Sequence, residues 1–221
     1  MKFVHPQIET VFSVDNGYVN ELVIENRRLF RTVIEDISLQ ISGFSGQSVL
    51  SIDNTPVETS KNAEIITNFV PFELNSKSLV SKIVQALEKK SVDADFFTAT
   101  AEILQRTETY LDSLTQDFSC DLVYGKLNMN SILKSVGISV DDSTKSNLEK
   151  LFDYTELVRE FDADKLFFLV NMRTFYSDND MNEFIKTALG HSSRVFLLES
   201  RPYSLLDNVK RVTIDDELCE F

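Results

Sequence analysis

The chain has little cysteine, no long apolar run and no excess of basic residues. Its 221 residues include two cysteines, Cys120 and Cys219, which form no CxxC pair, so neither a disulfide framework nor a cysteine-based metal site is expected. No apolar stretch approaches the roughly 20 residues that span a bilayer. The first residues lack the apolar segment of a secretory signal. Together these absences predict a cytoplasmic protein.

Acidic residues outnumber basic ones, 35 to 22, and the formal net charge is −13. This excess argues against a simple basic nucleic-acid binder, because neutralising phosphates needs local lysine and arginine. Net charge does not say where the charges lie, so local basic clusters remain open to interpretation. With 43% hydrophobic and 26% charged residues, the composition is that of a folded chain. The length suits one domain with an elaboration, or two small domains.

Two catalytic patterns are missing. The glycine-containing stretch 43–48 lacks the lysine of a phosphate-binding loop, and we interpret it as a helix cap and a turn. The two histidines, His5 and His191, have no neighbouring nucleophile, which argues against acyl-transfer chemistry; both are expected at the surface.

Residues 178–189 begin like a calcium-binding loop but lack its glycine and its final glutamate. A capped helix start is expected there instead.

Apolar patterning at both ends of the chain predicts an α/β body. Residues 10–24 are expected to form a hairpin with its turn at Asp15-Asn16-Gly17, and a helix should follow over residues 25–43. Near the C-terminus, 166–170 and 195–198 are uninterrupted apolar runs separated by a helix pattern. Two strands joined through a helix are parallel. The sequence therefore predicts a βαβ unit whose strands are buried on both faces.

The middle of the chain has a different character. Residues 77–163 follow the helical period almost throughout, with little strand signal. The predicted organisation is an α/β head made from residues 1–76 and 165–221, with an α-helical leg inserted over residues 77–164.

Polar residues follow both buried C-terminal runs. Asn171 and Arg173 come after the first, and Glu199 and Arg201 come after the second. Ligands of open α/β sheets bind beyond the carboxyl ends of the strands, and a carboxylate there can serve magnesium in an ATPase. Because no phosphate-binding loop accompanies these residues, we favour a local ion pair. An ATPase-like enzyme that uses Glu199 stays an alternative.

Basic residues are few but locally clustered. Arg27, Arg28 and Arg31 belong to one expected helix, and Arg28 and Arg31 share a face because they are three residues apart. Lys77 and Lys82 stand at the start of the helical segment. The ordinary interpretation of each cluster is a solvated face, and the alternative is contact with phosphates.

Several stretches resemble one family when their order and spacing are taken together. They are residues 25–31, 72–77 and 131–138, then LFFLVN at 166–171, a helix, and VFLLESR at 195–201. This pattern is similar to that of the small adaptation-stage CRISPR-associated protein that defines type II-A systems.

The resemblance implies an α/β head related to P-loop ATPases but without a nucleotide motif, carrying an inserted, extended helical leg. It implies a non-enzymatic homotetrameric ring that threads double-stranded DNA from its ends during spacer acquisition. The partners would be the CRISPR integrase complex and the effector nuclease of the same system. We assign the phosphate contacts to six residues, Arg27, Arg28, Arg31, Lys61, Lys77 and Lys82. A purely protein–protein adaptor of the same fold is the remaining alternative.

The resemblance also implies calcium, held by carboxylates of the leg. Some relatives carry a dense acidic run at the segment that matches residues 117–126. Here Asp117 and Asp121 remain as candidate ligands, whereas Val123 and Lys126 stand where acids are often found. Calcium takes six to eight oxygen ligands, so two aspartates predict a poorer site.

Overall fold

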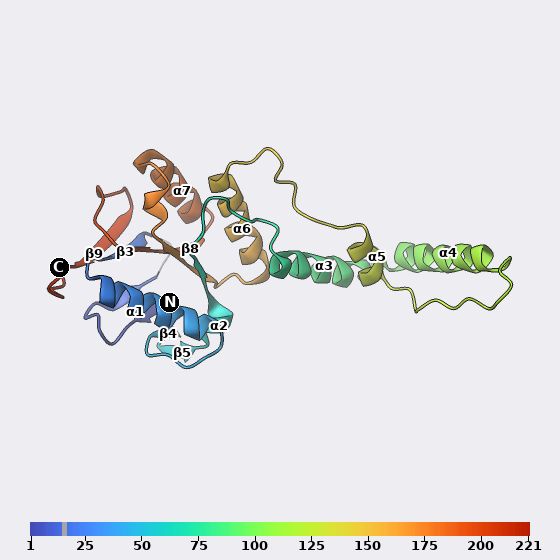
Figure 1. Cartoon of the computed structure of the whole chain (residues 1–221), viewed down its shortest axis with the longest axis horizontal. Coiled ribbons are helices and arrows are strands. Elements are labelled where there is room, and N and C mark those ends of the chain that lie inside the picture. The colour runs from blue at the N-terminus through green and yellow to red at the C-terminus, as the bar shows by residue number, and fades with distance from the viewer. Residues whose placement is uncertain (15–16) are drawn as a thin grey trace. The chain divides into compact units, whose positions relative to one another are not determined.

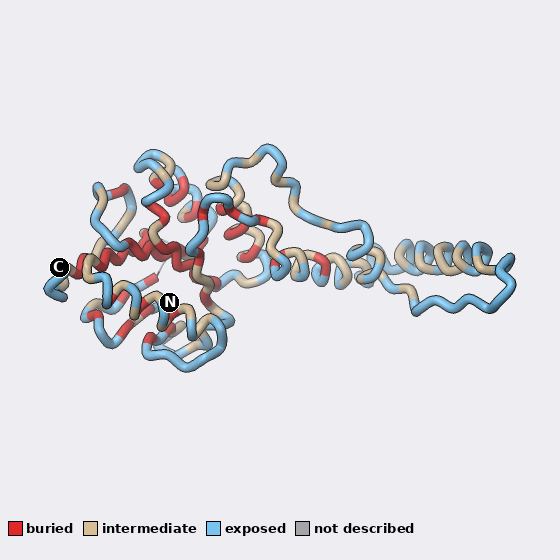
Figure 2. Tube along the Cα trace, viewed as in Figure 1, coloured by how far each residue is buried: buried red, intermediate tan, exposed pale blue. Residues whose placement is uncertain are grey.

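The computed structural model describes residues 1–14 and 17–221, and the chain divides into two compact units. The α/β unit comprises Met1–Leu74 and Ser143–Phe221, and the helical unit comprises Asn75–Asp142. The predicted α/β fold class is therefore confirmed. Buried residues concentrate in the α/β unit, whereas most of the helical unit is exposed or half-buried (Figure 2).

A parallel sheet forms the centre of the α/β unit. Among the described residues it has five strands, in the order β6-β7-β8-β3-β9, and every neighbouring pair is parallel. The strands are β6 (Ala63–Ile66), β7 (Leu166–Val170), β8 (Arg194–Glu199), β3 (Val19–Ile24) and β9 (Val209–Ile214). The chain passes from β7 to β8 through η1 (Met172–Thr174) and α7 (Asp178–Gly190). The predicted βαβ unit with buried strands is thus confirmed.

A second, antiparallel sheet has the order β2-β1-β4-β5. Its strands are β1 (Lys2–Val4), β2 (Phe12–Ser13), β4 (Val49–Ile52) and β5 (Thr55–Val57). The predicted hairpin over residues 10–24 is wrong, because β2 pairs with β1 while β3 lies between β8 and β9 in the other sheet. Two of its predicted turn residues, Asp15 and Asn16, fall outside the described residues.

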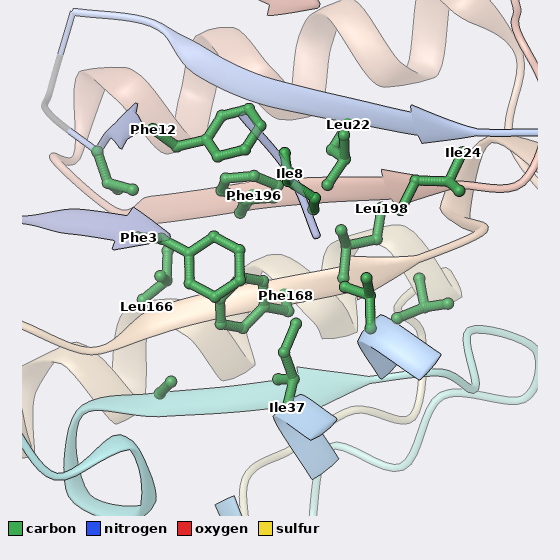
Figure 3. Close-up of a cluster of buried hydrophobic side chains, with 14 of the residues drawn as sticks. Phe3, Ile8, Phe12, Leu22, Ile24, Ile37, Leu166, Phe168, Phe196 and Leu198 are labelled. Atoms are coloured by element: carbon green, nitrogen blue, oxygen red, sulfur yellow. The ribbon is translucent and has the colours of Figure 1, made fainter. Parts of the chain in front are cut away.

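The parallel sheet is covered on both faces within the α/β unit (Figure 1). One face carries α1 (Arg27–Ile41) and the antiparallel sheet, and the other carries α6 (Asn147–Phe161) and α7. Phe3, Phe12, Phe168 and Phe196 form edge-on or tilted ring contacts with centroids 5.0–6.3 Å apart (Figure 3). Full burial of one such ring contributes about 1.5–3 kcal/mol. This cluster joins the two sheets.

The end of the helical unit is set by which helices pack on the second face of the parallel sheet, the face that carries α6 and α7. Tyr154 of α6 packs its ring on Phe167 of β7, with centroids 6.4 Å apart, and its hydroxyl donates to Glu64. Leu151 and Val158 of α6 are buried as well. The helical unit therefore ends at Asp142 rather than at residue 164, because α6 buries its apolar face against the sheet and belongs to the α/β unit.

Three helices make up the helical unit. They are α3 (Lys77–Ser91), α4 (Phe97–Thr115) and α5 (Met129–Ser135). The side chain of Ser76 caps α3, and that of Asn128 caps α5. No helix in the described part of the chain is both long and apolar enough to cross a membrane.

Candidate functional site

A group of five charged side chains, three of them buried, lies near the carboxyl ends of the central parallel strands. Arg173 follows β7, and its side chain is 1% exposed. Its Nη1 donates to Glu21 Oε1 at 2.9 Å and its Nη2 donates to Asp178 Oδ1 at 2.7 Å. Arg211 Nε donates to the other oxygen of Glu21 at 2.6 Å. We call Glu21, Arg173, Asp178, Glu199 and Arg211 the charged cluster.

Like Glu21, Glu199 at the end of β8 is fully buried. Its Oε1 accepts the backbone N–H of Arg173 at 3.1 Å, and its Oε2 has no hydrogen-bond partner among the described residues. Burial, helped by the nearby Glu21 charge, raises the pKa of Glu199 to about 7. Removal from water disfavours the charged form, so this carboxyl is about half protonated at neutral pH.

The loop between β8 and β9 closes over the cluster. Arg211 donates to the carbonyl oxygens of Tyr203 and Ser204 at 2.6 and 2.9 Å. The Tyr203 ring lies 4.8 Å from the guanidinium carbon of Arg173 and 4.9 Å from that of Arg201. The Tyr203 ring therefore lies against Arg173 on the side where an open α/β sheet would bind a ligand.

The four polar residues predicted at the strand ends thus have different surroundings. Asn171 adopts a left-handed backbone (φ +55°), and its side chain accepts the N–H of Ser200 at 2.9 Å, which ties β7 to β8. Arg173 and Glu199 belong to the charged cluster. Arg201 lies outside it, and its guanidinium contacts the Tyr203 side chain. Sequence reasoning missed Glu21, whose signal was a lone carboxylate inside the buried strand VNELVI.

The glycine-containing stretch after α1 cannot serve as a phosphate cradle. Four of its amide groups are already bonded: Asp36 accepts the N–H of Gln47 at 2.6 Å and that of Ser48 at 2.9 Å, and carbonyl oxygens of α1 accept those of Gly43 and Phe44. Gly43 has φ +86° and follows the end of α1. The predicted helix cap and turn are confirmed.

Three arginines are exposed along the first half of α1. Arg27 and Arg28 make no ion pair with any residue that the structure describes, and Arg31 Nε lies 3.7 Å from Glu35 Oε1. An exposed pair of this kind contributes about 0–1 kcal/mol. The Asn26 side chain accepts the N–H groups of Arg28 and Leu29 at 3.1 and 3.0 Å, which fixes the start of the helix. Unlike Arg173 and Arg211, these guanidiniums are available to an external anion.

The predicted lysines lie elsewhere. Lys61 is in α2 (Thr59–Asn62) and pairs with Glu58 at 2.6 Å. That helix contacts α1 through Gln40, about 13 Å along the helix axis beyond Arg31. Lys77 and Lys82 belong to α3 of the helical unit, where Lys77 is exposed and Lys82 is half-buried. Of the six predicted residues, the structure brings only the three arginines together within one unit.

Sequence comparison decides the family. A sequence model of the family described as CRISPR-associated protein (Cas_Csn2) matches residues 40–218. The chain belongs to this family. It is also 20% identical over 161 residues to a CRISPR-associated protein Csn2 of Enterococcus faecalis, and the match covers 72% of this chain and 74% of that relative. The type II-A CRISPR-associated family predicted from the sequence is thereby confirmed.

The calcium that the Csn2 resemblance implies does not fit the residues present. Asp117 and Asp121 are exposed, and the described residues contain no group of three or more His, Cys, Asp or Glu side chains placed to hold a metal ion. Nearby, Tyr124 donates its hydroxyl to Asp112 Oδ1 at 2.5 Å, a bond that raises the pKa of Tyr124 to about 12.

The remaining motifs have structural roles. Residues 178–189 form a capped helix start, as predicted, because Ser177 and Asp180 make a reciprocal capping box. His191 is about half exposed, and its Nδ1 lies 2.8 Å from Glu156 Oε2. His5 is only 2% exposed, so its expected surface position is wrong, and burial lowers its pKa.

Proposed function

We propose that this Csn2-family chain is a non-catalytic protein that binds the ends of double-stranded DNA in type II-A spacer acquisition. It would act as a homotetrameric ring through which the duplex is threaded. The observation that carries the proposal is the group of three exposed arginines on α1, two of them without an ion pair to any described residue, in a chain of net charge −13.

The arginines suit contacts with DNA phosphates. Contacts of this kind are independent of base sequence, and they make the affinity fall steeply with salt. In a symmetric ring each contact recurs in every subunit, so three arginines in four chains give 3 × 4 = 12 guanidiniums. An acidic remainder of the surface would repel DNA and restrict binding to the arginine-bearing face. Lys61, Lys77 and Lys82 are secondary candidates for the same role.

Three observations support a non-catalytic role over the ATPase alternative. Asp36 accepts the N–H groups of Gln47 and Ser48 in the stretch 43–48, Glu199 is fully buried and accepts the N–H of Arg173, and the β8–β9 loop places the Tyr203 ring over Arg173. A nucleotide would have to displace all three arrangements. We place the protein in the cytoplasm, with the CRISPR integrase complex and the effector nuclease as partners. The remaining alternative is an adaptor without DNA affinity.

A gel shift with two forms of one duplex tests the proposal. Linear DNA should be bound, and covalently closed circular DNA of the same sequence should not, because a ring can thread only a free end. Equal binding to both forms would refute threading, and binding to neither would favour the adaptor.

A charge-reversal pair tests the arginines. Arg28→Glu should weaken binding to linear DNA by tenfold or more and flatten its salt dependence, because one phosphate contact per subunit becomes a repulsion. A glutamate in the first turn of a helix favours the helix dipole, so α1 should stay folded. Lys186→Glu, at an exposed position of α7, makes the same charge change and should leave binding within twofold. An equal effect of the two variants would contradict the assignment.

A further inference from the structure

A hollow of about 310 Å³ lies between α6 and α7, two helices of the α/β unit that cover the same face of the parallel sheet (Figure 1). Its volume is at the lower end of the range of about 300–1,000 Å³ found for ligand sites. The lining residues are Lys145, Leu148, Glu149, Phe152, Asp153, Glu183, Phe184 and Thr187. None of these belongs to the charged cluster or to the arginines of α1.

The floor of the hollow is apolar and fixed in position. It consists of Leu148 and Phe152 from α6 and Phe184 from α7. Phe184 is 3% exposed and anchored in the core. The Phe152 ring meets the His191 ring edge-on, with centroids 5.2 Å apart, and His191 is itself held by Glu156. An incoming side chain would therefore find the floor already formed.

The rim of the hollow is acidic, with three carboxylates and one ammonium group, which leaves two negative charges in excess. Lys145 pairs with Asp153. Glu149 accepts the N–H and the hydroxyl of Ser146 at 2.7 and 2.8 Å, bonds that hold its pKa below the ordinary value and keep it anionic. The Glu183 carboxylate is exposed and makes no ion pair with a described residue. It is available to an external cation.

We propose that this hollow docks a basic segment of a partner protein, one that presents a bulky aliphatic or aromatic side chain next to lysine or arginine. The apolar side chain would enter between Phe152 and Phe184, and the cation would meet Glu183. Charge complementarity selects this occupant. DNA would bring phosphates to the carboxylates of the rim, and a contact between two copies of this chain is an outcome that sedimentation distinguishes.

Three fluorescein-labelled peptides test the proposal by fluorescence anisotropy with the full chain. The first carries leucine and phenylalanine four residues apart, flanked by lysines. The second has alanine at both apolar positions, and the third has glutamate in place of each lysine. The first should bind saturably, and the other two should bind at least tenfold more weakly. Absence of saturable binding of the first at millimolar protein, or equal binding of all three, would overturn the proposal.

Two matched variants locate the binding site. Glu183→Lys should weaken binding of the first peptide at least tenfold. Glu160→Lys makes the same charge change at an exposed position of α6 outside the hollow, so binding should stay within twofold. Equal losses would reveal general attraction to an acidic protein and would contradict the assignment. Circular dichroism should show both variants folded.

Two further readouts separate the alternative occupants. Sedimentation should give the same oligomeric state for Glu183→Lys and the unchanged chain, and a change of state would make the hollow a contact between copies, against the proposal. The DNA gel shift should be unaffected by Glu183→Lys. A DNA-binding failure of the unchanged chain would therefore refute the proposed function without touching this inference.

Discussion

Replacement of Glu199 by glutamine should remove a large pH dependence of stability. In the unfolded chain this carboxyl titrates near its ordinary pKa of 4.5, whereas in the folded chain burial raises its pKa to about 7. Between these values the folded form holds a proton that the unfolded form has released. The free energy of unfolding therefore falls as the pH rises from about 4.5 to about 7, and the contribution levels off above pH 7.

The size of the effect follows from the difference in pKa. A difference of about 2.5 units, at 1.36 kcal/mol per unit, corresponds to about 3 kcal/mol at pH 8 relative to pH 4. Glutamine keeps an acceptor for the Arg173 N–H but carries no titratable proton. Its two amide hydrogens face a site without a described acceptor, which adds a cost of about 1–3 kcal/mol at every pH.

Urea unfolding of both proteins, followed by circular dichroism from pH 4.5 to pH 8, measures the difference. The stability of Glu199→Gln relative to the unchanged chain should rise by about 3 kcal/mol across this range, whatever its offset. Glu73→Gln, at an exposed carboxyl, is the matched control and should follow the unchanged chain. Parallel curves for Glu199→Gln and the unchanged chain would refute a neutral buried Glu199.

Three further changes probe the fold by urea or thermal unfolding. Arg173→Met should cost about 1–3 kcal/mol, because it removes one of the two arginines that pair with buried Glu21 and leaves Arg211 as the other; the double change with Glu21→Leu should cost less than the sum of the two single changes, and a cost that simply adds would contradict the coupling. Phe196→Ala should cost about 3–5 kcal/mol, since its ring contacts three others in the core. Gly46→Ala should cost about 1–3 kcal/mol, because a Cβ there would lie 2.4 Å from the Gln40 side chain; an unchanged melting temperature would show that Gln40 moves freely.

The elements that the sequence predicts best are those whose whole environment is encoded locally. The runs at β7 and β8 consist of consecutive large apolar residues, and only burial on both faces of a sheet suits such runs. The intervening α7 has a serine and an aspartate three residues apart at its start, and this spacing is enough to form the capping box.

The pairing of strands is harder to predict, because it depends on segments that are far apart in the sequence. Residues 10–14 and 19–24 have the composition of a hairpin, yet β3 pairs with β8 and β9, which lie about 180 residues further on. Burial of β3 between two parallel neighbours leaves β2 to pair with β1 and to place Phe12 against Phe196. Local pattern identifies strands, whereas competition for buried positions decides their pairing.

The C-terminal limit of the helical unit, predicted at residue 164 and found at Asp142, differs for a related reason. The periodicity of α6 resembles that of α3, so the sequence groups the two helices together. What separates them is the surface that each contacts, and for α6 this is the ring of Phe167 in the parallel sheet.

In the candidate site, the spacing of the exposed arginines is enough to predict that they share a helix. The role of Glu21 could not be predicted in this way, because it depends on Arg211, which is 190 residues away.

The distribution of charge links the two proposed surfaces. Within the α/β unit, α1 with its arginines covers one face of the parallel sheet, and α6 and α7 with the acidic hollow cover the other (Figure 1). Ligands of opposite charge would therefore bind on the two faces of the α/β unit, with DNA phosphates on α1 and a basic protein segment between α6 and α7. Because attraction between exposed charges is screened beyond about 10 Å at 0.1 M salt, the two should bind without competing, and a DNA-bound chain would still present its acidic hollow to a partner.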